Sequence, residues 1–175
     1  IAAFAADENP DKIDLGVGVY RDEDGGTPIL DCVTRAEKIL LDTQTTKTYL
    51  GPRGVVGFND ATRALLLGKD SAVIAQDRAR TVQTPGGTGA LRVAADLLRR
   101  ARPGVQIWAS DPTWDNHLAL FPGAGVEVNS YPYFDAVNSI LRFDEMIAAL
   151  RQRTAGDAVL FHACCHNPCG VSPDP

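Results

Sequence analysis

Residues 84–91, TPGGTGAL, have the composition of an anion site because they place three glycines between an extended run and a helical pattern. The apolar run over 79–84 (ARTVQT) predicts a strand, and the spacing of apolar residues over 90–100 (ALRVAADLLRR) predicts a helix. A turn between them aims free backbone N–H groups and the positive end of the helix dipole at one point. A phosphate binds such a point without a basic side chain, and the Thr88 hydroxyl adds a further donor.

The spacing of this turn excludes two common phosphate loops. A Walker loop has Lys followed by Ser or Thr after its last glycine, where this chain has Ala90 and Leu91. A dinucleotide-binding fingerprint has a third glycine where Arg92 stands. Taken alone, the turn fits an anion site or a strand-to-helix connection whose glycines serve packing.

A second motif, SDPTWDNH at 110–117, follows the apolar run 105–109 (VQIWA), which predicts another strand. Ligands gather at the carboxyl ends of strands in an open parallel sheet, so an aromatic residue, an amide and an imidazole at such an end indicate a binding site. Trp114 offers a flat face to a ring. Taken alone, the motif fits equally well a core tryptophan at a helix start and a hydrogen-bonded surface histidine at His117.

A third motif, CCHNPCG at 164–170, follows the apolar run 158–163 (AVLFHA). Because Asn167 precedes Pro168, its backbone is held extended or in a turn, which fixes the amide for a phenolic or carboxylate oxygen. The histidines and cysteines here also suggest a metal site. However, adjacent cysteines on a strand point to opposite faces and no second C-x-x-C pair exists, so we expect no metal.

Together with two earlier motifs, these stretches resemble the class I (fold-type I) pyridoxal-phosphate-dependent aminotransferases, in particular the aspartate/aromatic aminotransferase subgroup. The resemblance runs over essentially the whole chain. It is carried, in order, by LGVGVY (15–20), TYLGPRG (48–54), QTPGGTGALRVAADLL (83–98), SDPTWDNH (110–117) and FHACCHNPCG (161–170).

The resemblance implies a role for each matching residue. Gly86, Gly87 and Thr88 would bind the phosphate of pyridoxal 5'-phosphate. Trp114 would stack on the pyridine ring and contact substrate, and Asn167 would bond the pyridine hydroxyl and the substrate carboxylate.

Three further implied roles concern the surroundings of that site. His117 would support the acid that protonates the pyridine nitrogen, and the backbone of Gly18 would contact the substrate carboxylate. Tyr49 would reach the phosphate of the neighbouring subunit's cofactor, which implies a homodimer with shared active sites.

The chain departs from the family pattern in two respects. Cys169 stands where the family usually has Thr, a change we expect to be tolerated because the backbone turn carries the function. The Schiff-base lysine and the substrate-binding arginines are not found, since Lys12, Lys38, Lys47 and Lys69 do not match the family's lysine motif. We therefore expect an N-terminal fragment that contains no catalytic residue and is inactive alone.

Composition narrows the class of protein. The 175 residues are 45% hydrophobic and carry a net charge of −5, which fits a globular domain and argues against a nucleic-acid binder. No apolar run is long enough to span a membrane, and the four cysteines indicate reduced thiols, so we expect a cytoplasmic protein.

The order of elements predicts an α/β fold. Helical spacing over 31–41, 57–67 and 143–153 accompanies apolar strands near 81, 106, 126 and 159. We expect a three-layer α/β/α arrangement with a mostly parallel sheet. By the resemblance, residues 1–27 form a small-domain segment and linker, and 28–175 form the first part of the large, cofactor-binding domain.

The expected reaction of the whole protein is amino transfer between an amino acid, aspartate first, and 2-oxoglutarate. Aromatic amino acid transfer is the alternative within the class. A non-catalytic module that binds a phosphate-bearing ligand is the alternative outside it.

Overall fold

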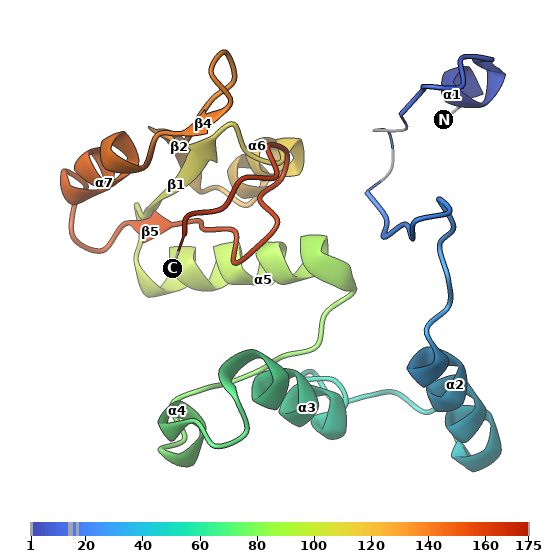
Figure 1. Ribbon diagram of the computed structural model, residues 1–175. Helices are drawn as coiled ribbons and strands as arrows, with labels where there is room; N and C mark the ends of the chain where they lie inside the picture. The colour runs from blue at the N-terminus through green and yellow to red at the C-terminus, as the bar shows by residue number, and fades with distance from the viewer. Residues whose placement is uncertain (1, 14–15, 17, 175) are drawn as a thin grey trace. The chain divides into compact units, whose positions relative to one another are not determined.

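The computed structural model describes residues 2–13, 16 and 18–174 in two compact units, Ile1–Tyr49 and Leu50–Pro175 (Figure 1). The first unit contains helix α1 (Ala2–Ala6) and helix α2 (Asp31–Thr43), which confirms the helix predicted over 31–41. Leu15 and Val17 of the LGVGVY motif lie outside the described residues. The predicted domain boundary after residue 27 concerns the longer protein and stays a prediction.

The second unit is built on a three-stranded parallel sheet with the order β2-β1-β5. Strand β1 (Gln106–Asp111) is central, with β2 (Glu127–Pro132) on one side and the short β5 (Ala158–Val159) on the other. Ile107 is the partner of Val128 in β2 and of Ala158 in β5. The strands predicted near 106, 126 and 159 are therefore confirmed.

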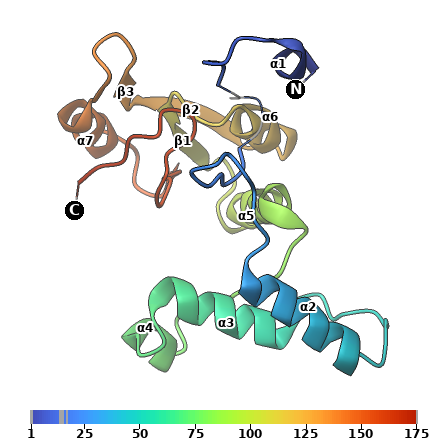
Figure 2. The ribbon, with the colours of Figure 1, turned by 45° about the vertical axis from the view of Figure 1, so that its right-hand side comes forward.

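Helices cover both faces of this sheet, as Figures 1 and 2 show for α6 on one side of the strands and α7 on the other. Helices α5 (Gly86–Ala101) and α6 (Asp115–Gly123) pack on one face, where Ala95 and Phe121 join Ile107 of β1 in a buried cluster. Helix α7 (Phe143–Arg151) packs on the other face through Met146, against Tyr131 of β2. The three-layer α/β/α prediction is confirmed.

The chain path explains why these helices lie on opposite faces. It passes from β1 through α6 to β2, and then back through α7 to β5 on the far side of β1. Two right-handed crossovers that run in opposite directions along a sheet place their helices on opposite faces. The loops that follow β1 and β5 therefore leave the same carboxyl edge of adjacent strands, where α/β proteins bind ligands. A small antiparallel hairpin, β3 (Phe134–Asp135) with β4 (Ile140–Leu141), was not predicted.

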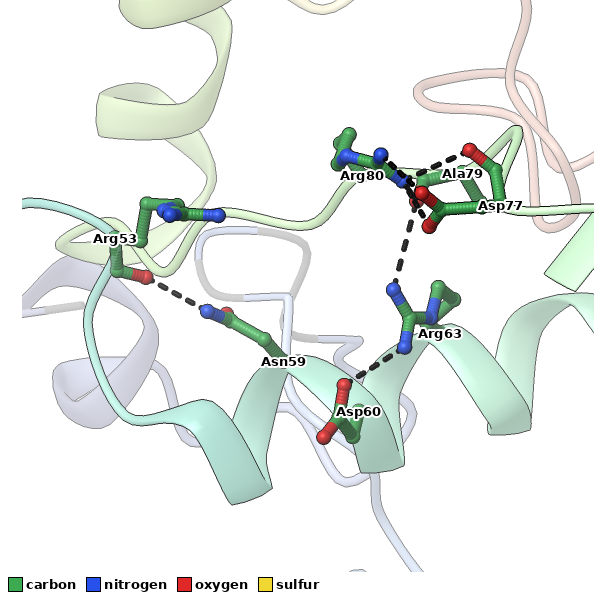
Figure 3. A network of polar contacts seen from close by, with 7 residues as sticks. All are labelled: Arg53, Asn59, Asp60, Arg63, Asp77, Ala79 and Arg80. Carbon is green, nitrogen blue, oxygen red and sulfur yellow. Dashed lines mark hydrogen bonds and ion pairs between the residues drawn. The ribbon is translucent and has the colours of Figure 1, made fainter.

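Helix α3 (Val56–Leu67) confirms the prediction over 57–67 and is followed by the short α4 (Ala72–Ala75). A polar network ties α3 to the chain that leads into α5 (Figure 3). Arg63 pairs with Asp60 at 2.8 Å and donates to the carbonyl oxygen of Ala79 at 3.5 Å. Arg80 pairs with both carboxylate oxygens of Asp77 through its two terminal guanidinium nitrogens, Nη1 and Nη2.

The strand predicted over 79–84 is wrong. This segment pairs with no strand in the described part of the chain. Gln83 instead bonds a loop: its N–H donates to the carbonyl oxygen of Arg53 at 3.1 Å, and its Oε1 accepts from the N–H of Val55 at 2.9 Å. An apolar alternating run becomes a strand only when a neighbour supplies a ladder of hydrogen bonds. The segment is instead a connection into the first turn of α5.

Candidate functional site

The glycine turn forms the first turn of α5, which begins at Gly86 and runs to Ala101. Gly86 has a φ of 66°, a left-handed conformation that glycine adopts without strain. Within the described chain, no side chain caps this helix end, and its first turn contains no acidic residue. Gly86, Gly87 and Thr88 are all exposed, and the first N–H groups of a helix have no partner within the helix. The binding of an anion by this turn stays a prediction.

Trp114 and His117 lie at the start of α6, directly after β1. Trp114 is the N-cap residue, and its ring meets the ring of His117 edge-on at a centroid distance of 5.3 Å. His117 is buried, and its Nδ1 lies 2.9 Å from Oγ1 of Thr113. The interpretation of His117 as a surface histidine is therefore wrong.

Asn167 lies on the loop that follows β5. Its backbone N–H donates to Nδ1 of His162 at 3.0 Å. Its side chain is exposed, and the amide has no hydrogen-bond partner among the described residues. The backbone of Asn167 is thus fixed while its side-chain donor and acceptor remain available.

One cavity of about 340 Å³ brings these elements together at the carboxyl edge of the sheet. It is lined by residues from α5, from the start of α6 and from the loop after β5: Leu91, Trp114, His117, Leu160, Phe161, His162, Cys164 and Asn167. Three predicted site residues, Trp114, His117 and Asn167, therefore share one cavity. The glycine turn does not line it but begins the helix that contributes Leu91. Gly18 and Tyr49 belong to the first unit, where both are exposed.

Three histidine rings follow one another at this cavity, where His117 and His162 belong to the lining and His166 does not. The ring of His117 meets that of His162 edge-on at 5.6 Å, and His162 stacks on His166 at 4.3 Å. Burial lowers the pKa of all three; for His117 and His166 the nearby His162 charge lowers it further, and the pKa of His166 falls to about 4. All three rings are therefore neutral near pH 7.

The sequence interpretation missed the residues that hold these rings. Thr113 and Ser110 bond His117 and His166, and both hydroxyls are buried. His162 and His166 were considered only as metal ligands. The available signal was their position at the end of the apolar run 158–163 and just beyond it, because the first residues beyond a parallel strand face the ligand edge. In the described residues no group of His, Cys, Asp and Glu side chains is arranged to hold a metal ion.

With this geometry established, the chain can be compared with known proteins. It matches the family described as Aminotransferase class I and II over residues 10–175. The chain belongs to this family.

Two relatives illustrate the range of similarity. The aspartate aminotransferase of Escherichia coli (strain K12) is 55% identical over 170 residues, which cover 97% of this chain and 43% of the relative. The aromatic-amino-acid aminotransferase of Pseudomonas aeruginosa is 49% identical over 168 residues, which cover 96% of this chain and 42% of the relative. The chain thus spans less than half the length of these relatives.

Solved structures agree on the fold. The aromatic-amino-acid aminotransferase from Burkholderia pseudomallei, described as covalently bound to pyridoxal phosphate, is 47% identical with a TM-score of 0.90; the match covers 99% of this chain and 43% of that chain. An aspartate aminotransferase from the cytoplasm of Saccharomyces cerevisiae is 31% identical with a TM-score of 0.85; the match covers 95% of this chain and 41% of that chain. No helix in the described part of this chain is long and apolar enough to cross a membrane.

Proposed function

We propose that the protein to which this chain belongs is a pyridoxal-phosphate-dependent aminotransferase that exchanges an amino group between aspartate and 2-oxoglutarate. The observation that carries the proposal is the cavity shared by Trp114, His117 and Asn167 beside helix α5. An aromatic face, a buried imidazole and a free amide converge there next to an uncapped helix N-terminus. That set matches a ligand with a phosphate, a heteroaromatic ring and a ring oxygen.

The donor set of the chain fits this cofactor. The first turn of α5 presents backbone N–H groups without a competing carboxylate. A Cβ added at Gly87 would meet no described atom within 4 Å, so the backbone there is open to close approach by an anion. The Thr84 hydroxyl bonds the carbonyl oxygen of Gly86 at 3.1 Å and so leaves the N–H donors of the turn free.

We assign the residues as follows. Gly86, Gly87 and Thr88 bind the cofactor phosphate, Trp114 stacks on the ring, and the Asn167 amide donates to the ring oxygen and contacts the substrate carboxylate. Pyridoxal phosphate, when bound, supplies the electron sink that amino transfer requires.

His117 is assigned to support the acid that protonates the ring nitrogen. The Thr113 hydroxyl and a lowered pKa favour a neutral His117 ring that can bond such an acid. Gly18 is assigned to the substrate carboxylate. The assignment of His117 follows the family resemblance together with the contacts described above, and that of Gly18 follows the resemblance.

Both substrate classes have support among the relatives. The E. coli aspartate aminotransferase is 55% identical to this chain, and the P. aeruginosa aromatic-amino-acid aminotransferase is 49% identical. The higher identity favours aspartate, and aromatic amino acids are the second candidate. A homodimer that shares its active sites through Tyr49, and a cytoplasmic location, complete the proposal.

Amino-donor profiling of the full-length protein tests this function. Purified protein is reconstituted with pyridoxal phosphate and assayed with 2-oxoglutarate against aspartate, phenylalanine and tyrosine. We expect kcat/KM to be highest for aspartate. A preference for the aromatic donors would select the second candidate, and the absence of turnover with every donor, despite bound cofactor, would refute the aminotransferase proposal.

A further inference from the structure

His166 joins the loop that carries Asn167 to the central strand of the sheet. Its Nε2 lies 2.8 Å from Oγ of Ser110 on β1, and its Nδ1 lies 3.0 Å from Sγ of Cys169. The carbonyl oxygen of His166 also accepts from the N–H of Gly170 at 2.7 Å, which closes the turn around Asn167. Both ring nitrogens and the backbone carbonyl of His166 therefore have hydrogen-bond partners. The partner of Nδ1, Cys169, is two positions after Asn167 in the sequence.

The His166 ring is held between two other rings. It stacks on Tyr133 at a centroid distance of 4.1 Å and on His162 at 4.3 Å, and the residue is only 3% exposed. Burial lowers its pKa to about 4, so the ring is neutral at pH 7. A neutral imidazole has one N–H donor and one acceptor nitrogen. His166 must therefore donate to one of its two partners, Ser110 or Cys169, and accept from the other.

The chemistry of the two neighbours sets that direction. A hydroxyl oxygen is a strong acceptor and a thiol sulfur a weak one, so the single N–H of the His166 ring is better used on Oγ of Ser110, 2.8 Å from Nε2, than on Sγ of Cys169. The Ser110 hydroxyl thus accepts from Nε2–H of His166. Nδ1 is then the acceptor nitrogen.

Cys169 is the remaining donor for that nitrogen. Its sulfur lies 3.0 Å from Nδ1, and the other acceptor nearby, the carbonyl oxygen of Val171, is at 3.8 Å. A thiol is a weak donor but matches this requirement, and a threonine or serine hydroxyl at the same position would match it as well.

We propose that Cys169 is a positioning residue, whose S–H donates to Nδ1 of His166 and thereby holds the turn that presents Asn167 to the cofactor. The inference rests on the proposed function of Asn167. It gives the unusual cysteine of this chain a defined role, as the donor to a ring whose other nitrogen bonds Ser110 on the central strand.

The test uses the full-length protein and compares Cys169→Ala with Cys169→Ser. The alanine variant lacks the donor, and the serine variant restores it. Cys165→Ala is the matched control for a thiol on the same loop, since Cys165 is exposed, does not line the cavity and is not one of the two partners of the His166 ring nitrogens. Two readouts are measured: the tautomer of His166 from ¹⁵N NMR of histidine-labelled protein, and the affinity for pyridoxal phosphate with the spectroscopic pKa of the bound cofactor.

We expect wild-type His166 to carry its hydrogen on Nε2. Loss of one neutral hydrogen bond should weaken cofactor affinity in Cys169→Ala by roughly 2- to 10-fold and raise the spectroscopic pKa in the same direction as Asn167→Ala. Cys169→Ser should restore both values, and Cys165→Ala should leave them unchanged. A wild-type hydrogen on Nδ1, or a Cys169→Ala protein that binds and titrates like wild type, would overturn the proposal.

The failure of the proposed function has a different signature. If Asn167→Ala itself leaves the cofactor titration unchanged, the assignment of Asn167 to the cofactor is wrong and the positioning role of Cys169 falls with it. If Asn167→Ala shifts the titration and Cys169→Ala does not, the assignment of Asn167 stands and the role of Cys169 alone is refuted.

Discussion

The backbone N–H of Asn167 donates to Nδ1 of His162 at 3.0 Å, so the backbone of Asn167 is bonded to a histidine ring that lines the cavity. This bond uses the backbone of Asn167 and none of its side chain. A substitution of the side chain can therefore remove the amide without releasing the loop. The arrangement makes Asn167 a suitable position for testing the cofactor assignment.

We predict that Asn167→Ala in the full-length protein retains the cofactor but raises the pKa of its visible absorption band. A donor to the ring oxygen stabilises the deprotonated form, and alanine removes that donor. Spectroscopic titration measures the shift. Asn138→Ala, on the exposed hairpin between β3 and β4, is the control. An unchanged pKa in Asn167→Ala would separate this residue from the cofactor.

The glycine turn gives a prediction that distinguishes folding from binding. We expect Gly87→Val to weaken binding of pyridoxal phosphate more than Thr88→Ala does. Thr88→Ala should reduce the binding free energy by about 1.5 to 3 kcal/mol, because one charge-assisted hydrogen bond is lost. A Cβ at Gly87 meets no described atom within 4 Å, so the added side chain obstructs the anion and not the protein. Equilibrium titration of the apoprotein with cofactor measures both losses.

Gly86→Ala is the matched variant for this comparison. Gly86 has a φ of 66°, and alanine in that conformation costs about 1 to 2 kcal/mol of unfolding free energy even without cofactor. Gly87→Val should leave the apoprotein closer to wild-type stability. Equal affinity losses for Gly87→Val and Thr88→Ala would contradict close approach of the phosphate to the backbone of the glycine turn.

The buried histidines predict a loss of stability on mild acidification. The pKa of His166 is about 4 in the folded protein and about 6.5 when unfolded, so below pH 6.5 the unfolded chain binds a proton that the folded chain excludes. The unfolding free energy therefore falls as the pH drops from about 6.5 toward 4. The contribution of His166 at pH 5.5 is a loss of roughly 1 to 1.5 kcal/mol relative to pH 7.5. His117 and His162 act in the same direction.

Urea unfolding of the full-length apoprotein at pH 7.5 and 5.5 measures this change. His166→Gln, which keeps a hydrogen-bonding amide but does not titrate, should reduce the difference between the two pH values. If His166→Gln loses as much unfolding free energy as wild type between pH 7.5 and 5.5, His166 does not contribute to the pH dependence of stability.

The sequence predicted the sheet and its helices where local pattern and tertiary packing agree. Ile107 is buried in the core and Val128 is half-buried against the same cluster, and both are in strands. Residues 79–84 have a similar pattern but no partner strand in the described chain, so their periodicity predicted a strand that does not form. Strand pairing is a long-range property that alternation alone does not contain.

The same limit applies to the site. Trp114 and Asn167 were predictable because their motifs follow apolar runs, and parallel strands collect such ends at one edge. Ser110 and Thr113 could not be predicted in the same way, because the role of a buried hydroxyl depends on its hydrogen-bond partner. The partner of Ser110, His166, is 56 positions away in sequence. Cys169 was expected to be tolerated because the backbone turn carries the function, whereas its sulfur lies 3.0 Å from the His166 ring nitrogen.

The last prediction concerns Tyr49, on which the shared-site dimer depends. Tyr49 ends the first unit and is exposed, in a loop bounded by glycine and proline. If its hydroxyl reaches a phosphate in the neighbouring subunit, Tyr49→Phe removes one hydrogen bond. Cofactor affinity should then drop by about 0.5 to 3 kcal/mol, depending on the charge of the acceptor.

Mixed dimers decide whether the loop acts on the neighbouring subunit. Full-length subunits carrying Tyr49→Phe are combined with subunits carrying Gly87→Val, and the heterodimer is isolated by differential tags. If Tyr49 acts across the interface, one site collects both defects and the other is intact, so titration gives one tight and one very weak site. If Tyr49 acts within its own subunit, each site carries a single defect and no wild-type site appears. We expect the first result, in line with the proposed shared-site dimer. It is decisive because a cofactor site with wild-type affinity can form from two defective subunits only when each subunit contributes its intact part to the same site.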